Sequence, residues 1–487
     1  METPHLYFDA GVGFLSVNRA CPLERACPLE GACPLEGACP LERACPLEGA
    51  CPLEGACPLE KEPVPWKEPS RGFVGETLRW IQDSRIMHST AVLLSVLAGS
   101  SIMVLAVEPL VPRFRAVNVD TNVAVGYGVS VADVDGDGGP DIILCDAKQI
   151  AWYRHPKWEK HVIAENLTPQ DHVCVAAADI DGDGKAEIAV GAGWNPGDTV
   201  NSGALFYLEP PTDRTARWTP IRLPHEPTMH RIRWVKDSQG WALWSVPLHG
   251  RGNKDGQGVG ARIQRHRPSA DRRQPWAVET VADQWHKAHN FDPVVRPGAT
   301  TVTQVLVGSA EGAFRGVLSG ANGAGGPVTW TQIGGPENGG VGEIRSLGDA
   351  QGSVAGISPM HGNQLVVFHP TASGADAATV ATGLGRREVV DDGLIDGHAL
   401  ACGDLLGIGQ PQIVAGWRAM GRPRSVKVGV ALYVPVGSRW MKVWVDDDGM
   451  ACEDLTLADL DGDGRLDIVA SGRSTHNLKV YFNESSR

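Results

Sequence analysis

The chain has 487 residues, of which 42% are hydrophobic, so it is long enough to build a large core. Its formal net charge is −13 and it has no basic patch with interleaved aromatic residues, which argues against a nucleic-acid partner. Glycine (59) and proline (34) are abundant while helical periodicity is scarce, a combination that favours an all-β chain rich in turns.

Residues 1–86 contain a tandem hexapeptide, (Arg/Gly)-Ala-Cys-Pro-Leu-Glu, that runs from Arg19 to Glu60 and holds seven of the eleven cysteines. A proline in every unit prevents a helix, and a six-residue unit is too short to bury a core. We therefore expect this region to be disordered, or to result from a wrongly assigned start codon. The other four cysteines lie in strand-like runs, where we expect buried free thiols.

Residues 87–106 begin at a methionine, are mostly apolar and end in small residues. This pattern is typical of a secretory signal peptide cleaved near Ala106, which predicts a secreted or periplasmic protein without a membrane span in its mature form. A transmembrane anchor is the alternative, although the stretch is marginal in length and is interrupted by Gly and Ser.

Three loops share the pattern Asp-x-Asp-Gly-Asp-Gly with a further carboxylate at the ninth position, and an apolar run of strand length follows each. Carboxylates at positions 1, 3, 5 and 9 supply the hard oxygens that calcium prefers, so we predict about three structural Ca²⁺ sites. Position 12 is apolar in all three loops, which excludes an EF-hand; an Asp/Gly-rich turn without an ion remains the alternative. The predicted ligands are Asp133, Asp135, Asp137 and Asp141, then Asp179, Asp181, Asp183 and Glu187, and finally Asp459, Asp461, Asp463 and Asp467.

Degenerate copies of this loop recur along the chain, at Asp237, Asp292, Asp349 and Asp404. A tryptophan with spaced apolar residues marks the outermost strand of several units, at Trp158, Trp218, Trp276, Trp330 and Trp440. Seven units of roughly 45–60 residues, each with about four short strands, predict a seven-bladed β-propeller over residues 113–484. The last unit has three clear strands, and we expect the strand 114–119 to complete it and close the ring.

The innermost strand of each unit begins six or seven residues before the loop, at one mouth of the central channel. These ring positions hold Tyr127, His172, His230, Glu343, His398 and Glu453, and a looser alignment, three residues before Asp292, adds His289. If the fold is right, four His and two Glu converge on one axis, where they could bind Zn²⁺ or another divalent metal or act as general acid and base. We therefore take His172, His230, His289, His398, Glu343 and Glu453 as candidate catalytic residues; surface histidines or channel plugs are the alternative.

The loops that follow the second strand of each unit should open on the same face. Their aromatic faces and their Asn, Arg and His donors suit a polyhydroxylated ligand, although ordinary loop polarity would look the same at any single position. The candidate substrate-binding residues are Trp194, Asn195, His249, Arg251, Asn253, Glu311, His361, Trp417 and Arg418.

The Asp loops are similar to the FG-GAP/VCBS repeats of integrin-like propellers, a likeness that implies the fold but not the chemistry. A further resemblance covers roughly residues 115–483. The segments Asp171-His-Val-Cys174, Gly193-Trp-Asn-Pro196, His225-Glu-Pro-Thr-Met-His-Arg231, Pro247-Leu-His-Gly-Arg-Gly-Asn253, Ala288-His-Asn-Phe291, Asp396-Gly-His-Ala-Leu400 and Val414-Ala-Gly-Trp-Arg418 resemble the propeller of aldos-2-ulose dehydratases.

That resemblance implies dehydration of a keto-sugar such as anhydrofructose, with a metal in the propeller and with His172, His230, His289 and His398 as metal ligands or proton-transfer groups. The cupin domains of that family have no counterpart before Arg487. The sequence thus predicts an exported carbohydrate-active lyase that acts on a small sugar or glycan. A non-catalytic carbohydrate- or protein-binding propeller, of lectin or adhesion type, is the alternative, and the oligomeric state stays open.

Overall fold

The computed structural model describes residues 111–486, except 255, 297, 319–326, 337–338, 371–384 and 421–425. The predicted repeat region 1–86 and the predicted signal peptide 87–106 lie outside the described residues. Every regular element in the described part of the chain is a β-strand. A search of the same part found no helix that is long and apolar enough to cross a membrane.

The strands form seven four-stranded antiparallel sheets, here called blades 1 to 7 in chain order. Blades 1 to 3 each run outward from the first strand to the fourth. Their strands are β2 (Gly128–Ala132), β3 (Asp141–Cys145), β4 (Gln149–Arg154) and β5 (Glu159–Glu165) in blade 1, β6 (Cys174–Ala178), β7 (Glu187–Ala192), β8 (Ala204–Glu209) and β9 (Thr219–Leu223) in blade 2, and β10 (Met229–Asp237), β11 (Gly240–Pro247), β12 (Ile263–Arg267) and β13 (Ala277–Ala282) in blade 3.

Blades 4 to 6 repeat this order, and blade 7 takes its fourth strand from the other end of the chain. Their strands are β14 (Ala288–Val295), β15 (Val302–Ser309), β16 (Gly312–Leu318) and β17 (Val328–Gly334) in blade 4, β18 (Ile344–Ser346), β19 (Val354–Ser358), β20 (Gln364–His369) and β21 (Arg386–Asp391) in blade 5, β22 (Gly397–Gly403), β23 (Gln412–Trp417), β24 (Gly429–Val436) and β25 (Arg439–Asp447) in blade 6, and β26 (Cys452–Ala458), β27 (Asp467–Gly472), β28 (Asn477–Asn483) and β1 (Phe114–Asp120) in blade 7.

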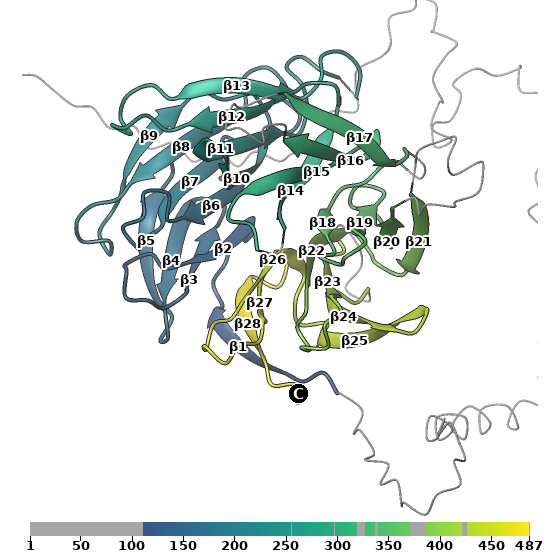
Figure 1. The fold of residues 1–487 in the computed structure, drawn as a ribbon. Helices are drawn as coiled ribbons and strands as arrows, with labels where there is room; N and C mark the ends of the chain where they lie inside the picture. Colours follow the sequence, from purple (N-terminus) through teal and green to yellow (C-terminus); the bar gives the residue numbers. More distant parts are fainter. Residues whose placement is uncertain are drawn as a thin grey trace, which may run out of the picture. The chain divides into compact units, whose positions relative to one another are not determined.

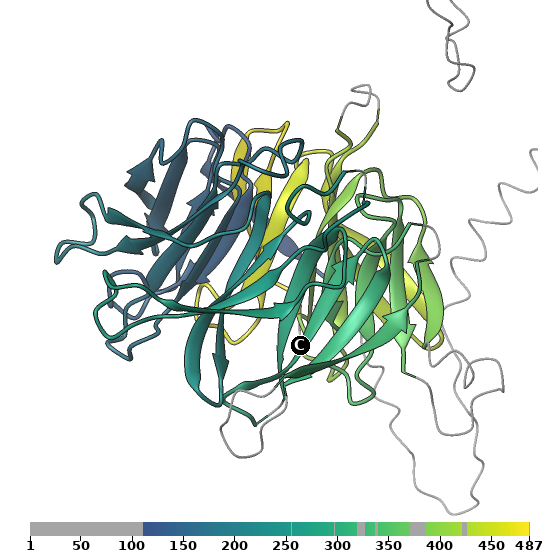
Figure 2. The same ribbon diagram turned by 90° about the horizontal axis from the view of Figure 1, so that it is seen from above.

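The innermost strands contact one another in a closed cycle, from β2 through β6, β10, β14, β18 and β22 to β26 and back to β2. Figure 1 shows the blades arranged in this way around a common centre, and Figure 2 shows them from a direction turned by 90°. The molecule is therefore a seven-bladed β-propeller, as the repeat spacing predicts. A propeller leaves only short protected sheet edges, which limits edge-to-edge aggregation.

The N-terminal strand β1 completes blade 7 by pairing antiparallel with β28, from Phe114 opposite Asn483 to Asp120 opposite Leu478. Main-chain contacts beyond the strands extend this pairing. The Arg113 N–H donates to Ser485 Oγ at 3.0 Å, and the Glu484 N–H donates to the Arg113 carbonyl at 2.9 Å. The described chain thus begins and ends in the same sheet.

The position of a strand within its blade determines its sequence pattern. Second strands lie between two neighbouring blades and are buried on both faces, so β3, β7, β19, β23 and β27 are buried along their whole length. Such strands appear as continuous apolar runs rather than as alternating ones. Fourth strands face solvent on one side; β9 and β13, for example, are mostly exposed. Of the four cysteines in strand-like runs, Cys145, Cys174 and Cys452 are buried free thiols, as predicted, while Cys402 is half-buried.

A cluster of Asp, Tyr and Lys joins neighbouring blades at three places. Asp120 on β1 accepts a hydrogen bond from Tyr153 Oη at 2.6 Å and one from Lys160 Nζ at 2.9 Å, both in blade 1. The same arrangement links blades 5 and 6 through Asp391, Tyr433 and Lys442, and blades 6 and 7 through Asp446, Tyr481 and Lys479. We call these groups the interblade clasps; the first one also ties the N-terminal strand to blade 1.

Candidate metal centre at the channel mouth

β-Bulges aim four of the predicted ring positions into the channel. In blades 3, 4, 6 and 7 the ladder between the first two strands skips one residue of the innermost strand. The skipped residues are His230, His289, His398 and Glu453. A bulged residue leaves the alternation of the pleat and redirects its side chain, which is why bulges are common beside functional sites.

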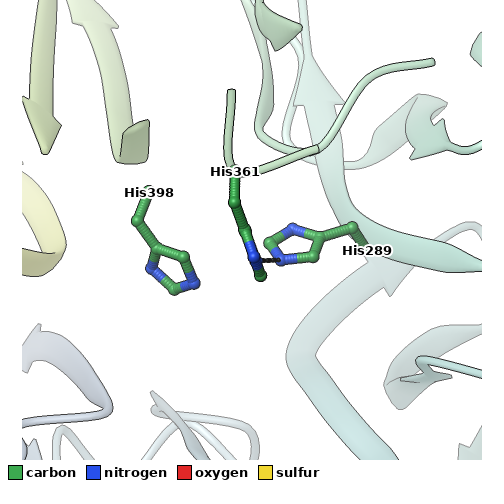
Figure 3. A group of neighbouring side chains, drawn as sticks. All are labelled: His289, His361 and His398. Atoms are coloured by element: carbon green, nitrogen blue, oxygen red, sulfur yellow. Dashed lines mark hydrogen bonds between the residues drawn. The ribbon is translucent and has the colours of Figure 1, made fainter. Parts of the chain in front are cut away.

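Three histidines from three blades meet at this mouth, as Figure 3 shows. His289 is the second residue of β14, His361 lies in the loop between β19 and β20, and His398 is the second residue of β22. The three imidazoles offer nitrogen atoms that all lie within 4.8 Å of one another. His289 Nε2 and His361 Nε2 are 2.6 Å apart, joined by a hydrogen bond in which one ring donates (Figure 3). His361 adopts a φ of 56°, in the left-handed region that a non-glycine residue seldom occupies.

The outer nitrogens of two of these rings point at acceptors. His398 Nδ1 lies 2.5 Å from the main-chain oxygen of Glu453 and donates to it, which leaves Nε2 as its ligating atom. His289 Nδ1 lies 3.3 Å from Glu343 Oε1, within ion-pair distance, yet neither atom has a well-aligned hydrogen bond among the described residues. An acceptor behind a ligating histidine fixes its ring orientation and raises its basicity, so both contacts are of the kind that supports a metal ligand.

The three imidazoles are held neutral. Burial lowers the pKa of His289 and of His398 well below the usual range, and neighbouring positive charges add to the effect. His361 is exposed at the mouth of the channel, but the protein atoms packed around its ring, followed by the charge of Arg418, lower its pKa to about 3. Neutral imidazole is the form that binds a metal. Three neutral imidazoles, two of them with outer partners, fit Zn²⁺ or a similar divalent ion with one position left for a ligand.

Two charged networks surround the three histidines. Arg418 Nη1 donates to both carboxylate oxygens of Glu453 at 2.7 Å, and Arg473 Nη1 donates to the same carboxylate at 2.9 Å. Glu343 lies 3.6 Å from both Arg231 and Arg345 and accepts a hydrogen bond from Asn290 Nδ2 at 2.5 Å. Arg418, Glu453 and Glu343 are among the site residues that the sequence predicts, whereas Arg231, Asn290 and Arg473 are not.

The sequence positions of Arg231 and Asn290 give a partial indication that these side chains belong to the site. Arg231 and Asn290 directly follow the ring positions His230 and His289, where strict alternation would turn a neighbour away from the channel. The bulge at each position cancels that alternation, so both consecutive side chains reach the interior. Arg473 follows the second strand of blade 7 and had no comparable marker.

We call His289, His361 and His398 the metal-type group. The other two predicted ring histidines, His172 and His230, lie outside it. His172 has both ring nitrogens beside main-chain groups: Nδ1 is 3.3 Å from the Asp146 carbonyl, and Nε2 accepts from the Leu167 N–H at 3.3 Å. His230 packs edge-on against His289, but its Nδ1 lies 2.8 Å from the His289 carbonyl and its Nε2 is 3.2 Å from Arg231 Nη1. Both rings therefore buttress the channel mouth through bonds to its backbone and neighbours.

The predicted substrate-binding residues have different surroundings. The indole of Trp194 stacks on His230 with ring centroids 5.0 Å apart, which places an aromatic face next to the metal-type group. His249, Asn253 and Glu311 line a cavity of about 600 Å³ together with His286 and Lys287. Within it, Glu311 Oε1 accepts from His286 Nδ1 at 2.9 Å, while the Asn253 amide donates to the main chain of its own loop and of His286.

The remaining three predicted residues are occupied elsewhere. Trp417 is buried in blade 6, where its indole N–H donates to the Lys427 carbonyl at 3.0 Å. Arg251 is exposed and donates to the Val200 carbonyl at 3.0 Å, and Asn195 caps a turn by accepting from the Gly197 N–H at 3.1 Å. These contacts describe where the side chains lie and leave their part in ligand binding a prediction.

The three predicted calcium loops present their carboxylates at one end of blades 1, 2 and 7. Asp133, Asp135 and Asp141 offer oxygens within 4.8 Å of one another, and the loops at Asp179 and Asp459 repeat this grouping. Gly136 and Gly138, with φ of 81° and 85°, allow the tight turn. Burial raises the pKa of Asp141, the ninth residue of the loop, to about 7, and the negative charges of Asp135 and Asp137 add to this shift. Crowded carboxylates that resist ionisation are a natural site for a cation.

Blade 6 shows how the same loop closes without that carboxylate. Asp404 still accepts from the N–H groups of Ile408 and Gly409, at 3.0 and 2.8 Å. At the ninth position Gln412 accepts from the Leu406 N–H at 2.9 Å through Oε1, and its amide nitrogen points at Asp404 Oδ1 at 3.4 Å. A neutral amide thus provides both an acceptor and a donor where the other three blades have an anion.

Comparisons with known proteins agree with the fold. Residues 124–190 match the family model of the FG-GAP-like repeat, and residues 175–208 match that of the FG-GAP repeat. No curated protein matches the chain. The chain is thus a seven-bladed β-propeller that carries FG-GAP repeats.

Solved structures that resemble the chain are distant. A chain of a mitotic checkpoint complex is 13% identical with a TM-score of 0.47, covering 81% of this chain and 99% of that one. The Cps50 (Swd1) β-propeller domain of Myceliophteria thermophila is 8% identical with a TM-score of 0.44, covering 75% and 99%. BBS1N in complex with ARL6DN is 12% identical with a TM-score of 0.47, covering 77% and 97%. Likeness at this level carries no argument about function.

Proposed function

We propose that the protein is a divalent-metal-dependent carbon–oxygen lyase that removes water from a keto-sugar at the histidine-rich mouth of the channel. The group of His289, His361 and His398 carries this proposal, because three neutral imidazoles in one place are costly to assemble and suit a catalytic zinc with an open position. Such an ion would supply Lewis acidity toward a ketone oxygen. The resemblance to aldos-2-ulose dehydratases supports the same reaction.

The surrounding residues suit an elimination. Loss of an α-proton and of a β-hydroxyl builds negative charge on the ketone oxygen, and the charge of Arg418 already acts on all three imidazoles. The pair of His286 and Glu311 is the proton-transfer candidate, since a carboxylate 2.9 Å from Nδ1 orients the ring. Lys287 connects this pair with the metal-type group: it lines the same cavity, and its charge acts on His361.

Sugar recognition is assigned to the adjacent surface. The exposed face of the Trp194–His230 stack offers an apolar platform for a sugar ring, and the cavity beside it offers polar groups for hydroxyls. We further propose that calcium occupies the three carboxylate loops, and that the protein is exported through residues 87–106. The calcium proposal rests on the loop pattern together with the carboxylate grouping described above, and the export proposal rests on the sequence pattern alone.

The proposal is tested on purified protein dialysed in calcium-containing buffer. Elemental analysis is expected to find about one tightly held transition-metal ion per chain. With 1,5-anhydrofructose as substrate, the rise in ultraviolet absorbance of a conjugated enone reports the elimination. His361→Ala is expected to lose both metal and turnover, whereas His369→Ala, a change on β20 where His369 pairs with Glu388, is the matched control.

Two results would overturn the proposal. Turnover that persists in metal-free protein would exclude a role for the ion. Saturable sugar binding without any enone formation, in protein shown to hold the metal, would identify the chain instead as a non-catalytic carbohydrate-binding propeller.

A further inference from the structure

A second cavity lies deeper in the channel, beyond the charged layer that surrounds the histidines. It has a volume of about 550 Å³ and is lined by residues of six of the seven innermost strands, so it belongs to the channel itself. Glu343 separates it from the metal-type group. One side of this carboxylate faces His289, at 3.3 Å, and the other faces Arg345, at 3.6 Å, which lines the deeper cavity.

Two guanidinium groups face this cavity. Arg233 reaches it from β10 and Arg345 from β18. Arg233 Nε donates to the Phe291 carbonyl at 3.2 Å, and Arg345 Nη1 donates to the Ile344 carbonyl at 2.7 Å, so both side chains are positioned by the backbone. Lys236 adds a third positive charge at the rim.

Arg233 has no carboxylate within 4.0 Å among the described residues, although Asp292 and Asp454 line the same cavity. Asp292 instead accepts from the Ser346 N–H at 2.8 Å, and Asp454 accepts from the Val129 N–H at 3.0 Å. Burial with Arg345 nearby lowers the pKa of Arg233 to about 10, which still leaves it charged at neutral pH. Arg233 is half-buried, and a charge that is partly removed from water without a carboxylate partner is costly to the fold, so its retention beside a cavity points to a ligand.

The two acids and the apolar wall narrow the ligand class. When the neighbouring Glu343 and its partner Arg231 are included, four positive groups face three carboxylates, which favours a ligand with a single negative charge over a dianion. A planar guanidinium matches a carboxylate in geometry and binds it with two parallel hydrogen bonds. Asp292, Asp454 and Thr456 offer acceptors for hydroxyl groups, while Trp241 and Leu455 offer an apolar face.

From these observations we propose that the deeper channel cavity binds a small polyhydroxy carboxylate of the sugar-acid class, with its carboxylate between Arg233 and Arg345 and its hydroxyls on Asp292 and Asp454. The site is distinct from the histidine group. The proposal stands whether or not the channel mouth carries a lyase.

The test is isothermal titration of calcium-loaded full-length protein with D-glucuronate, D-glucose and inorganic phosphate as probes. We expect glucuronate to bind saturably at one site and glucose at least about tenfold more weakly, because glucose lacks the charge that the guanidiniums recognise. Phosphate is expected to bind weakly as well, because it lacks the hydroxyls. Equal binding of glucose, equal binding of phosphate, or no saturable binding of glucuronate would each overturn the proposal.

Variants locate the site. Arg233→Met and Arg345→Met should each weaken glucuronate binding by about tenfold or more, whereas Arg439→Met, which removes the same charge from the exposed strand β25, should leave it unchanged. Melting curves accompany each variant, since Arg233 is deeply placed. If Arg233→Met fails to fold, Arg345→Met decides the question, and unchanged binding in that variant would refute the assignment.

Discussion

The carboxylate loops and the group of three channel histidines differ in how far apart their residues lie along the chain. Each carboxylate loop draws its ligands from nine consecutive residues, whereas the three histidines come from three blades, with His289 and His361 separated by 72 residues. The ligands also differ in kind: oxygen in the loops suits calcium, and imidazole nitrogen in the channel suits zinc. A loop can form with its own blade, but the histidine group exists only when blades 4, 5 and 6 have packed together.

That comparison leads us to expect that the loops contribute to stability and that the histidine group contributes chemistry. The former are clips within single blades, and removing their ions should weaken the fold. The histidine group depends on the packing of several blades, and replacing one of its histidines should leave the fold largely intact.

Removing calcium should have the largest effect on stability. A site filled at 100 times its Kd contributes about 2.7 kcal/mol to the free energy of unfolding, so three sites would contribute roughly 8 kcal/mol. Calorimetry with EGTA and re-added zinc, compared with excess calcium, measures the change. An unchanged melting temperature would show that these loops are ordinary Asp/Gly turns.

Replacing His289 should affect the channel metal alone. Even an outer partner of a metal-binding histidine changes affinity by about 10–100-fold, so His289→Ala should weaken zinc binding by more than about 100-fold. Competition against a chromogenic chelator measures this affinity, and calcium content serves as the internal control. Loss of calcium along with zinc would mean that the two groups are not independent.

Exchanging the ninth residue between loop types should reveal what the amide in blade 6 does. Gln412→Glu replaces the amide N–H group that points at Asp404 Oδ1 with a carboxylate oxygen, so that two carboxylates meet. We expect this to lower the free energy of unfolding by about 1–3 kcal/mol. Calcium should not rescue this variant, because positions 3 and 5 of the loop are Leu406 and Ile408. The reciprocal change Glu187→Gln should lower calcium affinity in blade 2. Rescue of Gln412→Glu by calcium would contradict the assignment of ligand positions.

The interblade clasps should give the smallest effect, and a pH-dependent one. Burial acts to raise the pKa of Asp120, but the hydrogen bonds from Tyr153 and Lys160 outweigh it and lower the pKa below 3.8. A lowered folded pKa stabilises the protein above the unfolded value, and this stabilisation is lost as the pH falls through the folded pKa. Tyr153→Phe should therefore destabilise by about 0.5–1.5 kcal/mol at pH 7 and by less at pH 2.5.

Chemical denaturation at the two pH values measures this difference, provided that folded baselines exist at both. Tyr207→Phe is the control, since the Tyr207 hydroxyl interacts with Arg272 rather than with an aspartate clasp. An equal loss at both pH values would show that the Asp120 charge does not matter to the clasp.

The sequence predicted the propeller because its loops repeat at a regular distance, and the same regularity located the ring positions. That spacing predicts a channel position for His398, and a looser alignment predicts one for His289. His361 was placed among the loop residues instead, because the loop between β19 and β20 has no fixed distance to the repeat. Spacing fixes only the level of a residue along the channel axis, whereas the direction of its side chain depends on bulges that leave no mark in the composition.

The interblade clasps have a sequence signal of their own, which differs from the repeat period. The Asp and Tyr of the three clasps lie 33, 42 and 35 positions apart along the chain. These separations are similar to one another and are shorter than the blade repeat. A pairing that crosses from one blade to the next does not follow the repeat period. For the same reason the repeat period does not predict the deeper cavity: its residues come from eight strands and one loop, and each strand contributes only one to three positions.

The pairing of β1 with β28 also determines when the protein can finish folding. Arg115 contacts Glu484, 369 positions further on, so at 5–20 residues per second the N-terminal strand waits roughly 20–70 s for its partner during synthesis. An unpaired apolar strand would be prone to aggregate over that time. β1 reads Phe-Arg-Ala-Val-Asn-Val-Asp, with Arg115, Asn118 and Asp120 interrupting its apolar residues. The strand that waits longest is thus polar enough to remain soluble until the ring can close.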